Sequence, residues 1–503
     1  MNDHDMLYDV AIVGYGPVGA VLANLLGQAG LSVAVLDREA SVYPLPRAVH
    51  FDGEVMRVFE SIGLKANVEA ISRTGIKGMH FVNAKQETLL IRAGSAELGP
   101  HGCANNYYFN QPDLDALLRE GITRFSNVDT HLQCEVTDVV SRADYVQLHV
   151  SRMIQGIKDK ATQKAKYVVG CDGARSMVRK AIGSTQKDLG LHQEWLVFDV
   201  ILRHEIPTLA DHTVQLCDPS RPMTYCCISA TRRRWEIMLM PGDDPIEMVK
   251  PSKLWELVSR WGVSTDVADI ERAVIYTFHS VVAQGWRKGR LLIAGDAAHQ
   301  MPPFLGQGMC SGVRDASNLA WKLKAIVQNM ADDSLLDSYE VERAPHVNAF
   351  IELAVRLGDI IQTTDKTKAL ERDAKFLSAK NGQPEVFLFP APRLGHVKNV
   401  SILQGEDALV GQIFPQPLLS TGQRLDTVAQ HRFTLLTRQA ILAKASDLSL
   451  HSWQSHDVAV IADAALLPWL NEHDLDAVVI RPDRYIYGVA KDAQALDKLI
   501  ATL

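Results

Sequence analysis

Apolar residues near the start of the chain form two short β-type runs with a helical stretch between them. Residues 7–13 are a β-branched run, residues 17–29 have apolar positions at helical spacing, and residues 32–36 form a second apolar strand. The stretch 10–36 as a whole is apolar enough to suggest a membrane span, but Gly-Tyr-Gly-Pro and Gln-Ala-Gly interrupt it. These breaks favour a strand–helix–strand unit over a transmembrane helix.

The same contrast of patterns continues through the middle of the chain. Residues 166–171 and 290–294 predict two further buried strands, and residues 311–327 and 335–356 predict helices. From about 194 to 240, short β-type runs alternate with turns. This change of pattern indicates a sheet inserted into the first domain.

The chain ends in a separate block of mixed pattern, which follows a looser segment with proline and glycine at about 380–420. Apolar strands are expected there at 433–436, 458–463 and 477–490, with helices between them. We therefore predict one α/β domain in two parts, an inserted β-sheet domain and a small C-terminal α/β domain. Their ranges are 1–185 and 281–380 for the two parts, 186–280 for the inserted sheet, and 381–503 for the C-terminal domain.

Composition narrows the class of protein. A chain of 503 residues is too long for one hydrophobic core, and 47% apolar with 22% charged residues is typical of a globular protein. The net charge of −7 argues against nucleic acid as the main partner. The seven cysteines lack metal-ligand spacing, and the N-terminus lacks the basic region of a signal peptide. We expect a cytoplasmic protein with reduced thiols and no membrane partner.

Gly14, Gly16 and Gly19 form a Gly-x-Gly-x-x-Gly motif directly after the first strand, where a helix is predicted to begin. The first glycine permits a tight turn, the second lets a pyrophosphate approach the backbone, and the third lets helix and strand pack closely. The N-terminus of the helix offers N–H groups and a positive dipole to phosphates. The motif predicts a dinucleotide site, with Pro17 and Val18 as further candidate contacts.

Asp37 stands at the end of the second strand, where an acid hydrogen-bonds a ribose hydroxyl. An acid at this position favours a ribose without a 2′-phosphate, so the motif alone leaves FAD and NAD open. Arg38 follows it and is a further candidate contact.

Three motifs together resemble a known family. They are VAIVGYGPVGAVLANLL at 10–26, YVVGCDGARSMVRKAIG at 167–183 and LLIAGDAAHQMPPFLGQGMCSGVRDASNLAWKL at 291–323. In this order they resemble the single-component (group A) FAD-dependent aromatic hydroxylases. Within that family the chain is most similar to the 3-(3-hydroxyphenyl)propionate hydroxylases and the polyketide hydroxylases.

The resemblance implies a fold and a cofactor. The fold would be α/β, with a Rossmann-like FAD-binding domain, an inserted β-sheet substrate domain as in para-hydroxybenzoate hydroxylase, and a thioredoxin-like C-terminal domain. The last of these contains no cysteine, which excludes disulfide chemistry there. FAD would be the bound cofactor.

The third motif would hold the flavin. By resemblance, Asp296 contacts the ribityl chain and Pro303 fixes a turn beside the ring. The backbone N–H groups after that turn would meet the pyrimidine edge at the positive end of a helix. The residues of this edge are Gly306, Gln307, Gly308 and Met309.

Other positions match the family more locally. Asp172 matches an acid linked to the FAD pyrophosphate, Arg47 and Gln111 match further FAD contacts, and the adenine would lie near Val136. His50 and Tyr225 are the candidate catalytic residues, the first for stabilising a phenolate or gating ring motion and the second for binding a substrate hydroxyl. Three consecutive arginines at 232–234 are expected to mark a solvated hairpin.

The reaction implied is hydroxylation of a phenolic substrate with NADH or NADPH and O2, through a flavin C4a-hydroperoxide. A hydroxylase of a polycyclic aromatic polyketide is the alternative substrate class. A flavin-binding protein without turnover is the alternative of another kind. The family also implies a homodimer.

Overall fold

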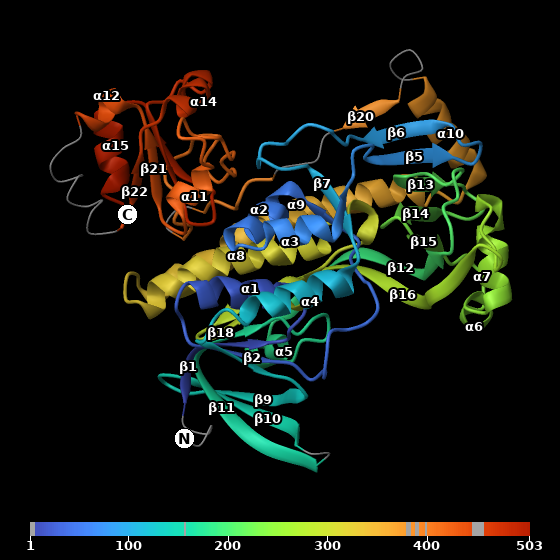
Figure 1. Cartoon of the computed structure of the whole chain (residues 1–503), viewed down its shortest axis with the longest axis horizontal. Helices are drawn as coiled ribbons and strands as arrows, with labels where there is room; N and C mark the ends of the chain where they lie inside the picture. The colour runs from blue at the N-terminus through green and yellow to red at the C-terminus, as the bar shows by residue number, and fades with distance from the viewer. Residues whose placement is uncertain are drawn as a thin grey trace.

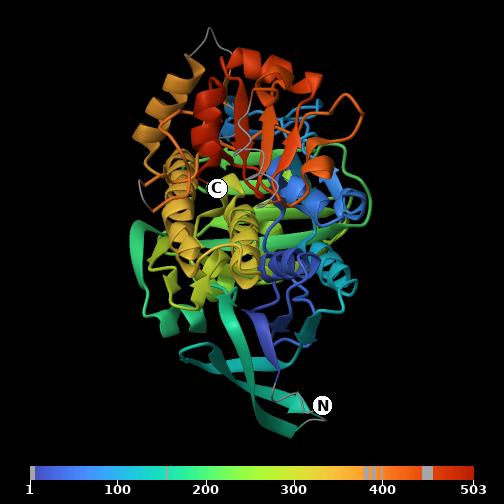
Figure 2. The same ribbon diagram turned by 90° about the vertical axis from the view of Figure 1, so that its left-hand side faces the viewer.

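The computed structural model describes residues 6–154, 157–378, 384–387, 392–397, 400–444 and 457–502. A nine-stranded sheet and a small C-terminal domain lie at opposite ends of the longest axis, and long helices run between them (Figure 1). In the view turned by 90°, the C-terminal domain and the N-terminal sheet lie at opposite ends of the molecule (Figure 2).

The N-terminal sheet has eight strands among the described residues, with β1 parallel to both β2 and β11. Helix α1 (Pro17–Gln28) joins β1 to β2, so the predicted strand–helix–strand unit is confirmed. None of the described helices is long and apolar enough to cross a membrane. The strands are β1 (Leu7–Val13), β2 (Val33–Leu36), β8 (Val128–His131), β9 (Cys134–Ser141), β10 (Val146–Ile154), β11 (Ile157–Gly170), β17 (Arg287–Lys288) and β18 (Leu291–Ile293).

The nine-stranded sheet is the inserted sheet with additions from elsewhere. Strands β5 and β6 come from the first section of the chain, and β5 pairs in parallel with β13. The pattern of the sequence did not predict this pairing. The strands are β5 (Met79–Asn83), β6 (Thr88–Arg92), β12 (Thr185–Leu202), β13 (Thr213–Cys217), β14 (Met223–Cys227), β15 (Arg232–Met238), β16 (Ala268–Gln284), β19 (His299–Gln300) and β20 (Glu385–Phe387).

The two faces of this sheet differ. One face packs a hydrophobic cluster against α6 (Pro245–Met248) and α7 (Pro251–Val258). The opposite face, which carries Trp195, Asp199 and Arg234, contacts segments of the FAD-binding part. We call it the inner face.

A three-stranded sheet and several helices complete the FAD-binding part. The strands are β3 (His50–Asp52), β4 (Ser72–Thr74) and β7 (Asn106–Phe109). The helices are α2 (Gly53–Ser61), α3 (Lys65–Ala70), α4 (Gln111–Ile122), α5 (Met177–Ile182), α8 (Gly308–Val327), α9 (Ser338–Ile361) and α10 (Lys366–Leu377). Short 3₁₀ helices are η1 (Ser259–Trp261), η2 (Gly295–Ala297), η3 (Pro303–Leu305), η4 (Asp333–Asp337) and η6 (Ala464–Leu466).

The C-terminal domain has a four-stranded sheet in the order β22-β21-β23-β24. Strand β23 is antiparallel to both of its neighbours and β22 is parallel to β21, which is the thioredoxin-like arrangement. The predicted boundary between 380 and 381 lies outside the described residues. The elements are β21 (Thr434–Thr437), β22 (Ala459–Ile461), β23 (Ala477–Ile480), β24 (Ile486–Ala490), α11 (Leu425–Ala429), α12 (Gln439–Leu442), α14 (Leu467–Glu472) and α15 (Ala493–Ile500).

Buried ion pairs fasten this domain to the rest of the molecule. Arg481 contacts Glu342 of α9 at 2.9 Å, and Arg57 of α2 contacts Asp426 at 2.6 Å. Breaking a buried pair on one side costs several kcal/mol, because the other charge stays buried. The domain is therefore a fixed part of the structure.

Candidate active site

The turn between β1 and α1 brings backbone N–H groups to a place that an anion can reach. Gly14 has a φ of 103°, and a Cβ there would lie 2.4 Å from the carbonyl oxygen of Cys171. A Cβ at Gly19 would lie 2.1 Å from the carbonyl oxygen of Gly14. At Gly16, no atom of the described residues lies within 4 Å of the Cβ position. The space beside Gly16, at the N-terminus of α1, suits a pyrophosphate.

Pro17 and Val18 have different roles in this turn. Pro17 is the first residue of α1, where its missing N–H costs no hydrogen bond. Val18 packs against Gly295 and Gly312, whose Cβ atoms would lie 3.0 and 2.4 Å from Val18 Cγ2. Val18 thereby brings the glycine-rich turn against the segment that carries Asp296.

Asp37 follows β2 and orders the same turn. Its Oδ2 accepts a hydrogen bond of 2.6 Å from the N–H of Tyr15, and its Oδ1 accepts one of 2.8 Å from the N–H of Glu39. The side chain of Arg38 is 73% exposed and pairs with Glu39. Val136, the predicted neighbour of the adenine, is a buried residue of β9. The structure therefore brings Asp37 to the turn, whereas Arg38 is directed into solvent.

Asp172 is the second residue after β11 and lies beside the glycine-rich turn. Its Oδ2 accepts hydrogen bonds from the N–H groups of Met177 at 2.6 Å and Val178 at 3.2 Å, at the start of α5. Its Oδ1 is buried and has no hydrogen-bond partner in the described part of the chain. Buried polar atoms normally have partners, so this oxygen suits a donor on a bound ligand.

The segment from η2 to the start of α8 contains the residues predicted to border the flavin, and we call it the flavin edge. The Asp296 side chain is exposed, yet desolvation by the protein around it raises the pKa of its carboxyl. A carboxylate in this situation lines a recess. Pro303 opens η3, and Gly306, with a φ of 66°, turns the chain so that α8 begins at Gly308, where Met309 is buried.

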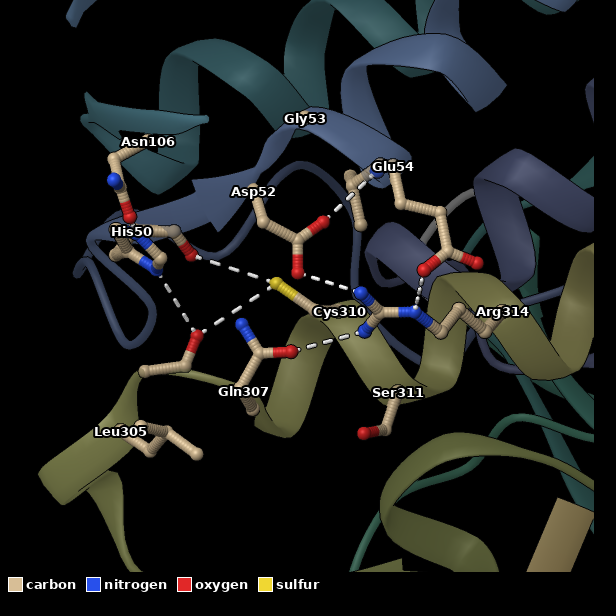
Figure 3. Close-up of polar contacts among 12 residues, drawn as sticks. His50, Asp52, Gly53, Glu54, Asn106, Leu305, Gln307, Cys310, Ser311 and Arg314 are labelled. Carbon is tan, nitrogen blue, oxygen red and sulfur yellow. Dashed lines mark hydrogen bonds and ion pairs between the residues drawn. The ribbon is translucent and has the colours of Figure 1, made fainter. Parts of the chain in front are cut away.

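Gln307 is held in place by a buried arginine (Figure 3). Its Oε1 accepts a 3.0 Å hydrogen bond from Arg314 Nη1, and Arg314 also contacts Asp52 and Glu54 at 2.6 Å each. Gln307 Nε2 is buried and has no partner among the described residues. A fixed amide whose Nε2 can still donate a hydrogen bond suits the polar edge of the flavin ring. Sequence reasoning missed Arg314, because its partners lie about 260 residues away.

His50 lies beside this turn in a buried network (Figure 3). Its Nε2 is 3.0 Å from Asn106 Oδ1 and its Nδ1 is 3.3 Å from the carbonyl oxygen of Gly306. Arg92, which the sequence did not single out, donates to Asn106 Oδ1 at 2.7 Å and to the carbonyl of Leu305 at 3.1 Å. Burial lowers the pKa of His50 to about 4. His50 is therefore neutral at pH 7, and any stabilisation of a phenolate would come from hydrogen bonding alone.

Arg47 lies in the segment 44–49, which we call the strap. Gln111 binds this segment through hydrogen bonds. Gln111 Oε1 accepts hydrogen bonds from the N–H groups of Arg47 at 3.0 Å and Ala48 at 2.7 Å. Gln111 Nε2 donates to Asp115 at 3.2 Å, and burial raises the pKa of Asp115 to about 7. Gln111 thus positions the strap, while the exposed Arg47 side chain is accessible to a ligand.

A buried ion cluster on the inner face also holds the strap. Arg234 contacts Asp199 at 2.6 and 3.0 Å and donates to the carbonyl oxygens of Arg47 at 2.6 Å and Pro46 at 2.7 Å. Arg272 donates to the same Pro46 carbonyl. The Arg234 side chain is only 2% exposed. The expectation of a solvated arginine hairpin is therefore wrong at this residue.

Tyr225 lies on the opposite face from this cluster. Its hydroxyl donates a 2.7 Å hydrogen bond to the carbonyl of Ala210, and its ring stacks on Trp261 at 5.0 Å between centroids. The ring of Trp235 packs against it at 5.3 Å. This geometry favours a packing role for Tyr225 over the predicted contact with a substrate hydroxyl.

The residues present fit FAD. Open space at Gly16 suits the pyrophosphate, and Asp37 stands where a ribose would lie. The unpartnered atoms of Asp172 and Gln307, together with exposed Asp296, mark where polar groups of a ligand would be bound. These features lie along one path from the β1–α1 turn to the N-terminus of α8.

The chain is similar to several known proteins. The family model described as FAD binding domain matches residues 7–354. The chain is 36% identical to a probable NADH-specific resorcinol 4-hydroxylase of Rhodococcus jostii (strain RHA1), over 98% of this chain and 94% of the relative. It is 33% identical to a 3-(3-hydroxy-phenyl)propionate/3-hydroxycinnamic acid hydroxylase of Mycobacterium avium (strain 104), over 99% and 91% of the two chains. The flavin-dependent monooxygenase PieE, solved with FAD and substrate, shares the fold with a TM-score of 0.82 at 20% identity, over 99% of this chain and 98% of that one.

Proposed function

This chain belongs to the family of FAD-dependent aromatic hydroxylases, and from that premise we propose which substrate it takes and which residues serve the reaction. The protein is an FAD-dependent monooxygenase that acts on an aromatic compound with a reduced nicotinamide and O2.

The proposed substrate is a small phenol, bound between the inner face and the flavin edge. One observation carries this: the inner face is fastened to both segments expected to border the flavin. Arg234 bonds the carbonyls of the strap, and Trp195 packs edge-on against Phe304 of η3 at 5.4 Å between centroids. A ring bound on this face would therefore meet the flavin. Both relatives described above are named for small phenols, which favours this class over a polycyclic polyketide.

Each part of the site then has a role. Bound FAD would supply hydride acceptance and oxygen activation, which no side chain here can perform. The N-terminus of α8 would stabilise negative charge at the pyrimidine edge. Asp296 and Asp172 would accept hydrogen bonds, Arg47 would neutralise phosphate, and the packed inner face would exclude water.

Three finer points belong to the same proposal. NADH is the proposed reductant, because the relative from Rhodococcus jostii is named as NADH-specific. The protein is also proposed to be a homodimer and to be cytoplasmic.

The test is turnover by the FAD-loaded protein. NADH and NADPH oxidation would be measured with resorcinol, 3-(3-hydroxyphenyl)propionate, 3-hydroxycinnamate and a polycyclic phenol, and products would be identified by mass. We expect NADH oxidation to rise with one small phenol and a product one oxygen atom heavier. Product from the polycyclic phenol alone would favour the polyketide class. Slow oxidation that no aromatic compound stimulates would favour a flavin-binding protein without turnover.

A further inference from the structure

Glu236 lies on the inner face at the centre of β15. Alternate residues of a strand point to opposite faces, so Arg234, Glu236 and Met238 share the inner face. Trp235 and Ile237, between them, belong to the hydrophobic cluster on the other side. Glu236 is thus a carboxylate on the face assigned to the substrate.

The register places Glu236 between the two points where the inner face meets the flavin-bordering segments. On β12, Asp199 pairs with Arg234, Val197 with Glu236, and Trp195 with Met238. The first of these pairs reaches the strap and the last reaches Phe304, as described above. Glu236 therefore lies in the row between the two contacts, where a substrate ring is expected.

The carboxylate of Glu236 has no hydrogen bond to any residue that the structure describes. Arg234 Nη1 forms an ion pair with it at 3.8 Å, which is beyond hydrogen-bonding distance. The donors of Arg234 are directed to Asp199 and to the strap carbonyls. On the neighbouring strand, Thr224 is already bonded to Gln215 at 2.5 Å. With its side chain 9% exposed, Glu236 is a nearly buried acceptor that a ligand can satisfy.

The charges of this face disfavour an anionic substrate. Arg234 lies 3.8 Å from Glu236, but its N–H groups donate to Asp199 and to the strap. Arg272 also donates to the strap and lies next to Asp199. A substrate carboxylate placed there would meet Glu236 beside guanidinium groups that already bind Asp199 and the strap. Two carboxylates in contact repel each other strongly where water is excluded. Burial raises the pKa of Glu236, although Arg234 and Arg272 act in the opposite direction.

We propose that Glu236 accepts a hydrogen bond from a hydroxyl of a neutral polyhydroxylated benzene and selects against phenols that carry a carboxylate. This inference deepens the proposed function and rests on it. Resorcinol would represent the favoured class and 3-(3-hydroxyphenyl)propionate the disfavoured class.

The test compares binding of these two phenols to the FAD-loaded protein. Dissociation constants would be measured by calorimetry and by the change in flavin absorbance, without NADH, so that binding is separated from turnover. In the wild type we expect resorcinol to bind about tenfold or more tightly than the carboxylated phenol. Glu236→Gln should weaken resorcinol binding and strengthen binding of the carboxylated phenol, so that the preference shrinks by about tenfold or more.

Two controls keep the result interpretable. Glu271→Gln removes the partner of Arg232 elsewhere in the sheet and should leave the preference unchanged. Thermal unfolding would show that each variant is folded. Glu236→Asp keeps the negative charge and should therefore still bind resorcinol more tightly than the carboxylated phenol.

The outcomes separate the two proposals. A wild-type preference for the carboxylated phenol, or a preference that Glu236→Gln leaves unchanged, overturns the role of Glu236 while hydroxylation of a phenol still stands. The role of Glu236 is likewise overturned if another phenol is hydroxylated and its binding does not respond to Glu236→Gln. If no phenol binds or stimulates NADH oxidation, the proposed function fails and the role of Glu236 fails with it.

Discussion

Arg314 donates a 3.0 Å hydrogen bond to Gln307 Oε1 and so fixes the residue that immediately precedes α8 (Figure 3). The guanidinium is itself held by Asp52 and Glu54, which flank the start of α2. One buried arginine thus links the flavin edge to a segment about 260 residues earlier. This link makes the flavin edge a property of the folded core rather than of a loop.

Replacing Arg314 with methionine should strongly destabilise the protein. Asp52 and Glu54 would be left as nearly buried carboxylates without a cation, and losing one side of a buried pair costs about 3–5 kcal/mol. Chemical denaturation would measure the free energy of unfolding. Arg203→Met, which breaks an exposed pair with Asp269, is the control and should cost about 1 kcal/mol or less. Equal losses in the two variants would contradict this role of Arg314.

Gly16→Ala and Gly14→Ala should separate cofactor binding from folding. Gly16 has a φ of −73° and open space at its Cβ position, so alanine should leave the unfolding temperature unchanged. Its methyl group would occupy the phosphate path and weaken FAD binding by about tenfold or more, as measured by fluorescence titration. Gly14→Ala should lower the unfolding temperature, because φ is 103° and the new atom meets a carbonyl oxygen. Unaltered FAD affinity in Gly16→Ala would place the pyrophosphate elsewhere.

Stability should fall as the pH drops from about 6.5 toward 4, in part because of His50. Its pKa is about 4 in the folded protein and near 6.5 when unfolded, so in this range only the unfolded chain takes up the proton. The expected loss is at most about 1.4 kcal/mol per pH unit for this residue, and it fades above about pH 7. His101 and His431, also shifted to about 4, act in the same direction.

His50→Gln should therefore make the decline shallower. Free energies of unfolding would be measured by denaturant titration at pH 7 and pH 5 for both proteins. The variant should lose about 2 kcal/mol less than the wild type over this interval. Parallel declines would mean that His50 is not held neutral.

Tyr225→Phe should affect stability and leave substrate binding unchanged. The hydroxyl bonds the Ala210 carbonyl on the outer side of the sheet, and losing such a bond costs about 0.5–1.5 kcal/mol or somewhat more if the carbonyl stays unsatisfied. Denaturation would measure this loss, and calorimetry with the preferred phenol would measure binding. A clear weakening of substrate binding would restore Tyr225 as a candidate contact.

Local pattern was enough to predict the dinucleotide turn and much of the chain around it. The glycine spacing, the apolar runs on each side and the acid after the second strand are set within about 30 residues. Backbone conformation there depends on near neighbours, because glycine alone permits the φ of Gly14 and the close approach at Gly19. Strands of the C-terminal domain could be predicted from their apolar runs, whereas its thioredoxin-like arrangement was implied by the resemblance to the family.

The substrate side of the site could not be predicted in this way. Side chains alternate along a strand, so Tyr225 of β14 and Glu236 of β15 point to opposite faces of the sheet. Packing decides which of these faces lies against the FAD-binding part, and the sequence does not show it. The same holds for Arg234, whose contact with Pro46 joins residues 188 positions apart. Local sequence was sufficient to predict the cofactor turn and the family. Which charged residues are buried on the inner face followed from the tertiary structure alone, because it depends on contacts between segments distant in the chain.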